Sequence, residues 1–141
     1  MGNQIFRSSL IRRSARFAYA LVFLATLTSI GQAQTSRGWL HGSWEGTGYQ
    51  IDANETWTMN LRVQGNKFVI EYPSLKCHGV WRLLDMDSRN ARFRERITFG
   101  VSGCANNGNV TIERLNRRQI AFRYSYSDTR EISASAILNR K

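Results

Sequence analysis

The sequence contains few of the groups that enzymes use for catalysis. Only two histidines, His41 and His78, occur among 141 residues, and each lies near the end of a predicted strand. The sequence has no nucleophile elbow, phosphate-binding loop, HExxH zinc motif or catalytic cysteine–histidine arrangement. Glu45 and Glu95 are candidates for a carboxylate pair that hydrolyses glycans, but the alternation of their strands points them to opposite sides. These absences argue against an enzyme.

The sequence also lacks an apolar run long enough to cross a bilayer. The run FAYALVFLATLTSI at 17–30 has 14 residues, whereas a transmembrane helix needs about 20. It follows an arginine-rich segment without acidic residues and precedes Gly31-Gln32-Ala33, whose small residues suit a signal peptidase. We therefore expect a cleavable signal peptide at 1–33 and one domain at 34–141 that is periplasmic or secreted, with no transmembrane segment in the mature form.

Acidic residues are scarce, since 20 Lys and Arg stand against 10 Asp and Glu. Without the four arginines of the predicted signal peptide, 16 basic residues remain against 10 acidic ones, a formal charge of +6. A domain with this charge attracts anionic surfaces, most strongly at low ionic strength. For an exported protein we expect an anionic envelope component or a protein as partner, and no nucleic acid.

Cysteine occurs only twice, at Cys77 and Cys104, and an even number in an exported chain favours a disulfide. Cys77 precedes and Cys104 follows a predicted hairpin at 80–99, so antiparallel pairing brings the two together. The bond closes a loop of about 28 residues and stabilises the domain by roughly 3–4 kcal/mol. A metal site with His78 is the alternative, but these ligands make a poor set, and we expect no metal.

Alternation of apolar and polar residues with a period of two dominates the rest of the chain. The segments TWTMNLRV at 56–63 and ARFRERITF at 91–99 both follow it. This pattern is typical of half-buried strands rather than helices. The eight predicted strands are 44–51, 56–63, 67–72, 80–86, 91–99, 109–115, 119–126 and 131–139. In the last of them, alternation places Ile132 on the inward side.

The fold class that these strands predict is all-β. Eight short strands in an antiparallel meander favour an eight-stranded closed or nearly closed barrel, a common solution for a small domain because closure removes free sheet edges. A two-sheet sandwich is the alternative, because alternation does not distinguish closure from stacking.

Glu95 is the most informative single residue, because alternation places its carboxylate on the apolar side of its strand. A buried carboxylate has to be paired, hydrogen-bonded or protonated. One interpretation is a ligand-binding or acid–base group inside the barrel. The other, which we favour, is a structural network. The candidate structural partners are Arg82, Arg114, Tyr124 and Trp57.

Aromatic side chains on the same inward face are numerous enough to line a pocket, although in a small domain they usually form the core. Trp39, before the first strand, is expected to cover one end of the barrel or to meet a partner. The candidate ligand-binding residues are Trp44, Gln50, Trp57, Trp81, Glu95, Tyr124 and Tyr126.

Two sequence blocks carry a resemblance to a known domain. They are YPSLxCxG at 72–79 and FRERIxxG at 93–100, accompanied by Trp44-x-Gly46, Cys104 and the GNV at 108–110. Together they resemble a small bacterial extracytoplasmic domain found in secreted hypothetical proteins and in the outer portions of some bacterial serine/threonine kinases. The match spans most of 44–138. The resemblance brings no assigned activity and implies a sensing or binding module.

A weaker likeness concerns the start of the barrel. Leu40-x-Gly42-x-Trp44 resembles the G-x-W start of the lipocalin and avidin superfamily, whose members are eight-stranded barrels. Gly46 stands where the avidin pattern has an asparagine, so the likeness does not extend to biotin binding.

The sequence therefore predicts a non-catalytic periplasmic or secreted binding module without a cofactor, for an envelope component, a small ligand or a protein. A hydrophobic-ligand carrier is the sharper form, and it requires an open cavity with Glu95 at its floor. One alternative is an inhibitor of an envelope-degrading enzyme such as lysozyme, although two basic proteins repel each other at long range. The other is a glycan hydrolase that uses Glu45 or Glu95.

Overall fold

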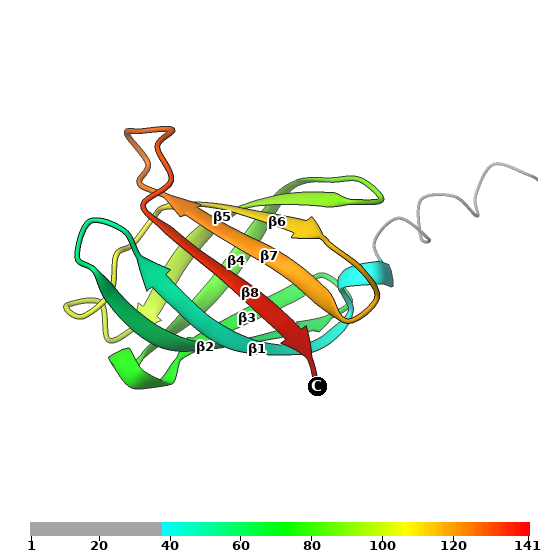
Figure 1. Ribbon diagram of the computed structural model, residues 1–141, viewed down its shortest axis with the longest axis horizontal. Helices are drawn as coiled ribbons and strands as arrows, with labels where there is room; N and C mark the ends of the chain where they lie inside the picture. Colours follow the sequence, from blue (N-terminus) through cyan, green and yellow to red (C-terminus); the bar gives the residue numbers. More distant parts are fainter. Residues whose placement is uncertain (1–37) are drawn as a thin grey trace, which may run out of the picture. The chain divides into compact units, whose positions relative to one another are not determined.

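The computed structural model describes residues 38–141, which form an eight-stranded antiparallel barrel (Figure 1). Each strand pairs with the next in the sequence, and the first and last strands pair with each other. The predicted signal peptide at 1–33 lies outside the described residues. The strands are β1 (Gly42–Gln50), β2 (Glu55–Gln64), β3 (Lys67–Tyr72), β4 (Cys77–Met86), β5 (Asn90–Phe99), β6 (Asn109–Arg114), β7 (Gln119–Ser125) and β8 (Ala134–Arg140).

The pairing of β1 with β8 decides between the two predicted architectures. The ladder runs from Trp44 opposite Arg140 to Gln50 opposite Ala134. Because these strands satisfy each other's backbone groups, the meander ends without an open edge. The closed barrel is confirmed, and the two-sheet sandwich is wrong.

Alternate residues of the strands fill the interior, as the sequence pattern predicts. In β2 the buried side chains are Trp57, Met59, Leu61 and Val63. Aromatic rings from four strands meet at the centre. The Phe93 ring lies 4.8 Å from that of Phe68 and 5.5 Å from that of Trp81, and Trp81 stacks on Phe122 at 5.8 Å. Aromatic packing of this kind dominates the stabilisation of small cores.

The last strand begins later than predicted. Pairing between β7 and β8 starts at Tyr124 opposite Ala134, so Ile132 has no strand residue opposite it. Ile132 lies instead in the connection at 126–133 with 46% of its surface exposed. The prediction that it faces inward is wrong, because alternation continues along the sequence past the point where the ladder ends.

The two ends of the barrel differ in the length of their connections (Figure 1). The turns at 65–66, 87–89 and 115–118 lie at one end, which we call the closed end. The connections at 51–54, 73–76, 100–108 and 126–133 lie at the other, the open end, and include the two longest ones, at 100–108 and 126–133. Helices within residues 38–141 are limited to two single 3₁₀ turns, η1 (Gly38–Leu40) and η2 (Pro73–Leu75). Neither is long enough to span a membrane.

The turn η1 covers the closed end. Trp39 and Leu40 are buried there, and the indole N–H of Trp44 donates to the Leu40 carbonyl at 2.9 Å. The guanidinium of Arg140 lies 4.1 Å from the centre of the Trp44 ring and donates to the carbonyls of Trp39 and His41. The prediction that Trp39 covers one barrel end is confirmed.

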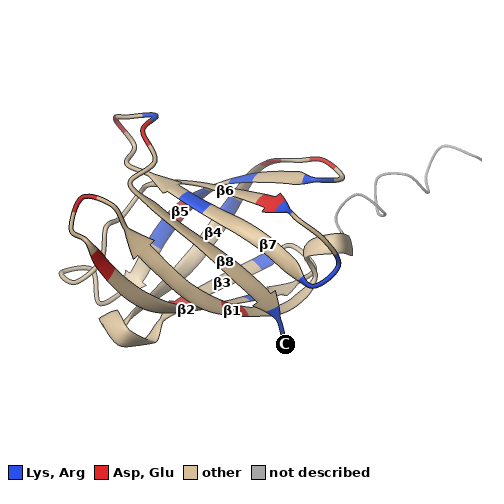
Figure 2. Ribbon diagram, in the orientation of Figure 1, with Lys and Arg blue, Asp and Glu red and all other residues tan. Residues whose placement is uncertain are grey.

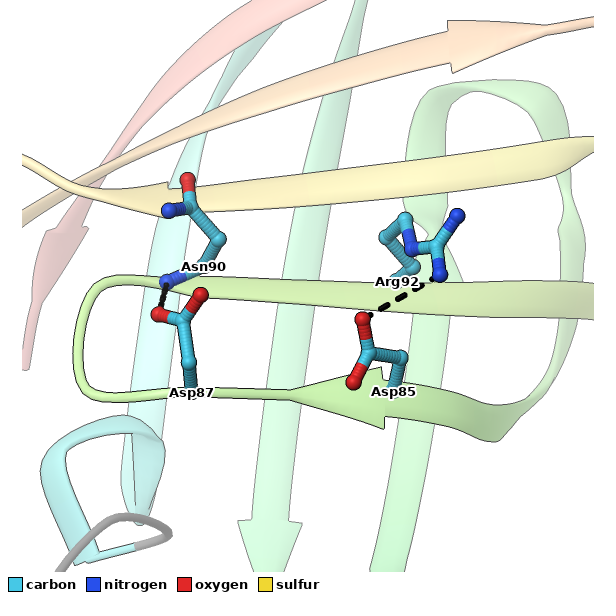
Figure 3. Close-up of polar contacts among 4 residues, drawn as sticks. All are labelled: Asp85, Asp87, Asn90 and Arg92. Atoms are coloured by element: carbon cyan, nitrogen blue, oxygen red, sulfur yellow. Dashed lines mark hydrogen bonds and ion pairs between the residues drawn. The ribbon is translucent and has the colours of Figure 1, made fainter.

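The β4–β5 turn holds this cover in place from the side. The indole N–H of Trp39 donates to the Asp87 carbonyl at 2.9 Å. The Asp87 carboxylate accepts the backbone N–H groups of Arg89 and Asn90, which lower its pKa, and Arg92 pairs with Asp85 at 3.1 Å (Figure 3). The turn is therefore fixed by its own side chains.

The predicted disulfide between Cys77 and Cys104 is present, with the two Cα atoms 6.5 Å apart. Cys77 begins β4, and Cys104 lies in the β5–β6 connection. The bond ties the longest connection of the open end to the wall of the barrel.

Candidate ligand-binding cavity

A cavity of about 290 Å³ opens at the open end of the barrel. Its wall consists of inward side chains from the ends of the strands, and its mouth consists of the open-end connections. Small-molecule sites are usually concave and mostly apolar with a few polar groups, and this cavity lies at the lower end of their size range. The lining residues are Gln50, Asp52, Ala53, Glu55, Thr56, Trp57, Tyr72, Leu75, Glu95, Gly103, Cys104, Ala105, Phe122, Tyr124, Tyr126 and Ala134.

Trp57 reaches the cavity because the residue opposite it is a glycine. Gly48 pairs with Trp57 in the β1–β2 ladder, and both are buried. A Cβ added at Gly48 would lie 2.6 Å from two carbons of the indole. The missing side chain therefore lets the ring lie across β1.

Tyr124 is positioned in the same way by Gly108, where an added Cβ would overlap the phenol ring. Its side chain is only 5% exposed, and its hydroxyl has no hydrogen-bond partner among the described residues. Burial raises the pKa of Tyr124, and the nearby Glu95 carboxylate raises it further. An unpartnered buried hydroxyl costs free energy, which makes this atom a candidate ligand contact.

Glu95 is 2% exposed and lines the cavity from β5. Its Oε1 accepts the Tyr72 hydroxyl at 2.5 Å and the Trp81 indole N–H at 3.0 Å. No hydrogen bond from the described residues reaches Oε2. Burial raises the pKa of Glu95, while the hydrogen bonds from Tyr72 and Trp81 oppose that rise. The carboxyl group is thus held by one oxygen and free at the other.

The predicted structural partners of Glu95 are wrong. Arg82 is exposed on the outer face opposite Arg94, and Arg114 ends β6 at the closed end. The actual partners are Trp81, which lies directly opposite Glu95 in the β4–β5 ladder, and Tyr72. Tyr72 begins the YPSLxCxG block and Glu95 lies in the FRERIxxG block, so the two blocks meet at this hydrogen bond.

Three polar side chains form a network at the mouth. The Gln50 amide donates to Asp52 at 2.5 Å and to the Tyr126 hydroxyl at 3.3 Å, and that hydroxyl donates to Asp52 at 3.3 Å. The hydrogen bond from Gln50 is the largest cause of a lowered pKa at Asp52. Burial and then Asp52 raise the pKa of Tyr126. This network links the β1–β2 turn to the end of β7.

The cavity is acidic although the protein is basic. The charged residues that line it are Asp52, Glu55 and Glu95, and no Lys, Arg or His within residues 38–141 lines it. Figure 2 shows red in the β1–β2 connection, whereas basic segments occur along outer strands such as β5 and β7. The charge of the cavity lining is thus opposite in sign to the net charge of the protein.

The sequence-predicted site residues divide between two places. Gln50, Trp57, Glu95, Tyr124 and Tyr126 line the cavity. Trp44 lies at the closed end, and Trp81 lies behind Glu95 without lining the cavity. The prediction omitted Phe122, Leu75 and Asp52. Tyr72 alternates in phase with the inward residues of β3 and belongs to the predicted inward aromatic set, but it was not among the candidate ligand-binding residues. Asp52 and Leu75 belong to connections, where alternation gives no signal.

Glu45 and Glu95 do not form a carboxylate pair. Glu95 is inside the barrel, while Glu45 is half-exposed and pairs with Lys141 at 2.7 Å. His41 and His78 are exposed, and His78 stacks on Phe99 with ring centres 5.0 Å apart. Residues 38–141 contain no group of three or more His, Cys, Asp or Glu arranged to hold a metal ion.

No protein-family model and no curated protein matches the chain. Its fold is shared by solved structures of designed proteins. One redesigned beta barrel is 14% identical with a TM-score of 0.55, covering 76% of this chain and 96% of that chain. Another, mFAP1 bound to DFHBI, is 13% identical with a TM-score of 0.56, covering 75% and 99%. The fold is thus that of a small closed β-barrel, and at these identities the likeness extends no further.

Proposed function

We propose that the protein is a non-catalytic binding module that holds a small organic ligand in the open-end cavity. The observation that carries this proposal is the cavity itself, with a buried carboxyl at its floor and five aromatic side chains around it. The hydrophobic-ligand carrier predicted from the sequence required such a cavity. A preformed site of this kind reduces the ordering cost of binding.

Two further observations support this proposal. The barrel mFAP1, of similar fold, binds DFHBI in its solved structure, which illustrates that a barrel of this size has room for a small molecule. The two blocks that resemble an extracytoplasmic sensing or binding domain contribute Tyr72 and Glu95 to the cavity. With the predicted signal peptide, we propose that binding takes place in the periplasm or outside the cell.

An anionic envelope component fits the cavity poorly, because no basic side chain of the described residues lines it. Such a partner would instead meet the outer face, where Arg82 and Arg94 lie opposite each other in the β4–β5 ladder. The small-ligand function is therefore the one the geometry supports best.

The proposal is tested with a variant whose larger side chain fills the cavity. Ala134 lines it from β8, and its neighbour Ser135 faces the other side of the same strand. A library of small molecules is screened against the mature domain by thermal shift, since a ligand that binds the native state raises the Tm. We expect hits whose binding is abolished by Ala134→Leu and kept by the control Ser135→Leu. Hits that bind both variants equally, or no hits, would contradict the proposal.

A further inference from the structure

We propose that the cavity selects a small organic cation, such as a quaternary or protonated amine, over neutral and anionic molecules of the same shape. The inference rests on the proposed function and specifies the ligand class. It comes from the charge, the aromatic lining and the unpaired polar atoms of the cavity.

The charge inventory is the first observation. In the predicted domain at 34–141, 16 Lys and Arg stand against 10 Asp and Glu, yet the charged lining residues are Asp52, Glu55 and Glu95. A random sample of this surface would favour basic residues. Arg94, the basic residue that acts on Tyr124 electrostatically, is held by the Asn107 carbonyl at 2.9 Å. A cleft lined by one sign of charge concentrates counter-ions of the other sign.

The aromatic lining is the second observation. The rings that line the cavity are Trp57, Tyr72, Phe122, Tyr124 and Tyr126. The faces of aromatic rings carry partial negative charge and attract cations within about 6 Å, and clusters of such rings recognise quaternary ammonium groups. Tyr124 and Tyr126 meet edge to face, with centres 5.7 Å apart. The lining therefore suits a cation with an apolar exterior better than a strongly hydrated one.

Glu95 supplies the counter-ion at the floor. Tyr72 and Trp81 fix its orientation through Oε1, and Oε2 lacks a hydrogen bond from the described residues. A buried carboxylate without a cationic partner is costly, and none of the ion pairs within residues 38–141 involves Glu95. A bound cation next to Oε2 would supply the missing charge. The Tyr124 hydroxyl, also unpartnered, offers an acceptor for an N–H group or a donor to Glu95.

Three isosteric probes test the inference. Choline, 3,3-dimethyl-1-butanol and 3,3-dimethylbutanoate share a branched head of the same shape but are cationic, neutral and anionic. Each is titrated into the ¹⁵N-labelled mature domain at low salt. We expect choline to shift signals of the cavity residues with at least a tenfold lower Kd than the neutral alcohol, and the anion to leave them unchanged. Equal binding of choline and the alcohol, or no shift with choline at millimolar concentration, would overturn the inference.

Two variants assign the selectivity to specific groups. Glu95→Gln keeps the size and an acceptor oxygen for Tyr72 and Trp81, and we expect it to remove the preference for choline. Glu55 is exposed at the mouth, so Glu55→Gln should not impair folding. For this variant we expect about a twofold loss of affinity for choline. Retention of the full preference in both variants would contradict the role of these carboxylates.

The pH dependence gives an independent readout, because choline carries its charge at every pH. Affinity should rise with pH as Glu95 ionises and should be flat in Glu95→Gln. The titratable groups that face Glu95 from other strands are Tyr72 on β3 and Tyr124 on β7, whose pKa values lie above their usual range. Asp52 and Glu55 lie at the mouth, so Asp52→Asn and Glu55→Gln check their contribution. A choline affinity that falls or stays constant as pH rises would overturn the role of Glu95 as the counter-ion.

The outcomes separate this inference from the proposed function. If the neutral or anionic probe binds the cavity best, the ligand class is wrong and the binding function stands. If no probe and no library molecule shifts the cavity signals, the binding function itself fails.

Discussion

The closed and open ends of the barrel are built in opposite ways. At the closed end, Arg140 stacks on Trp44 and donates to two backbone carbonyls, and the indoles of Trp39 and Trp44 also have partners. At the open end, residues 38–141 provide neither a hydrogen-bond partner for the Tyr124 hydroxyl nor an ion pair for the buried Glu95. One end is satisfied internally, and the other retains unpaired polar groups around a cavity.

This comparison teaches that stabilisation and binding are separated along the barrel axis. Buried polar groups without partners lower stability, and deviations from full satisfaction are expected at functional sites. Changes at the closed end should therefore affect stability alone, whereas changes at the open end should affect binding.

The largest stability loss is expected from Trp44→Ala, which removes the centre of the closed end. Truncation of a buried tryptophan costs about 3–5 kcal/mol. The free energy of unfolding from urea denaturation measures the loss. In the fraction that stays folded, binding at the cavity should be unchanged. A loss of under 1 kcal/mol, or a change in the Kd of the folded fraction, would contradict the separation of the two ends.

Removal of the disulfide by Cys77→Ala with Cys104→Ala is expected to cost roughly 3–4 kcal/mol in the chain-entropy model. Because Cys104 lines the cavity, this change should also loosen the open end. Hydrogen exchange should accelerate at 100–108 and stay unchanged at 87–89. The reduced wild-type protein is the control, and equal acceleration at both ends would argue against a local effect.

Gly108→Ala is expected to destabilise by about 1–3 kcal/mol through overpacking, because the new methyl group would overlap the Tyr124 ring. Displacement of Tyr124 should also weaken ligand binding. Gly38→Ala is the matched control, since an added Cβ there meets nothing within 4 Å. Equal free energies of unfolding of the two variants would contradict the prediction, because Tyr124 would then accommodate the methyl group without a loss of stability.

The smallest expected effect is a change with pH. Burial raises the pKa of Glu95 above 4.5, so the native state holds this proton more tightly than the unfolded chain. The stability that this proton contributes is fully present below pH 4.5 and is lost as pH rises through the raised pKa. Glu95→Gln does not ionise, so its stability relative to wild type should improve as pH rises above 4.5 in urea denaturation. Glu45→Gln is the exposed control, and a relative stability that falls with pH would contradict the raised pKa.

Much of the fold could be predicted from the sequence because each strand faces one interior. The alternation in 56–63 and 91–98 correctly separated inward from outward residues, and the position of the cysteines around one hairpin predicted the disulfide. Phe99 continues the inward phase of its segment but is 60% exposed, because the register of β4 against β5 shifts next to it. Ile132 shows where this reasoning ends. Its alternation fits a strand, but the length of the partner strand decides where pairing stops.

The candidate site could be predicted only in part. Alternation placed Glu95 inside the barrel, but its partners depend on the register of β4 against β5 and on the reach of Tyr72. The alternation pattern does not predict which residue of one strand lies opposite which residue of the next. Nor did composition reveal that an acidic cavity lies inside a basic protein, because the charge of a site depends on which few residues converge.

The four tryptophans provide the most direct test of the account. Trp39 and Trp44 lie at the closed end, and Trp57 lines the cavity. Trp81 does not line the cavity but donates a hydrogen bond to Glu95, which does. Their indole N–H signals are followed in ¹⁵N NMR spectra while a cavity ligand is added. The account predicts that Trp57 and Trp81 shift and that Trp39 and Trp44 do not. Shifts confined to Trp39 and Trp44 would contradict it.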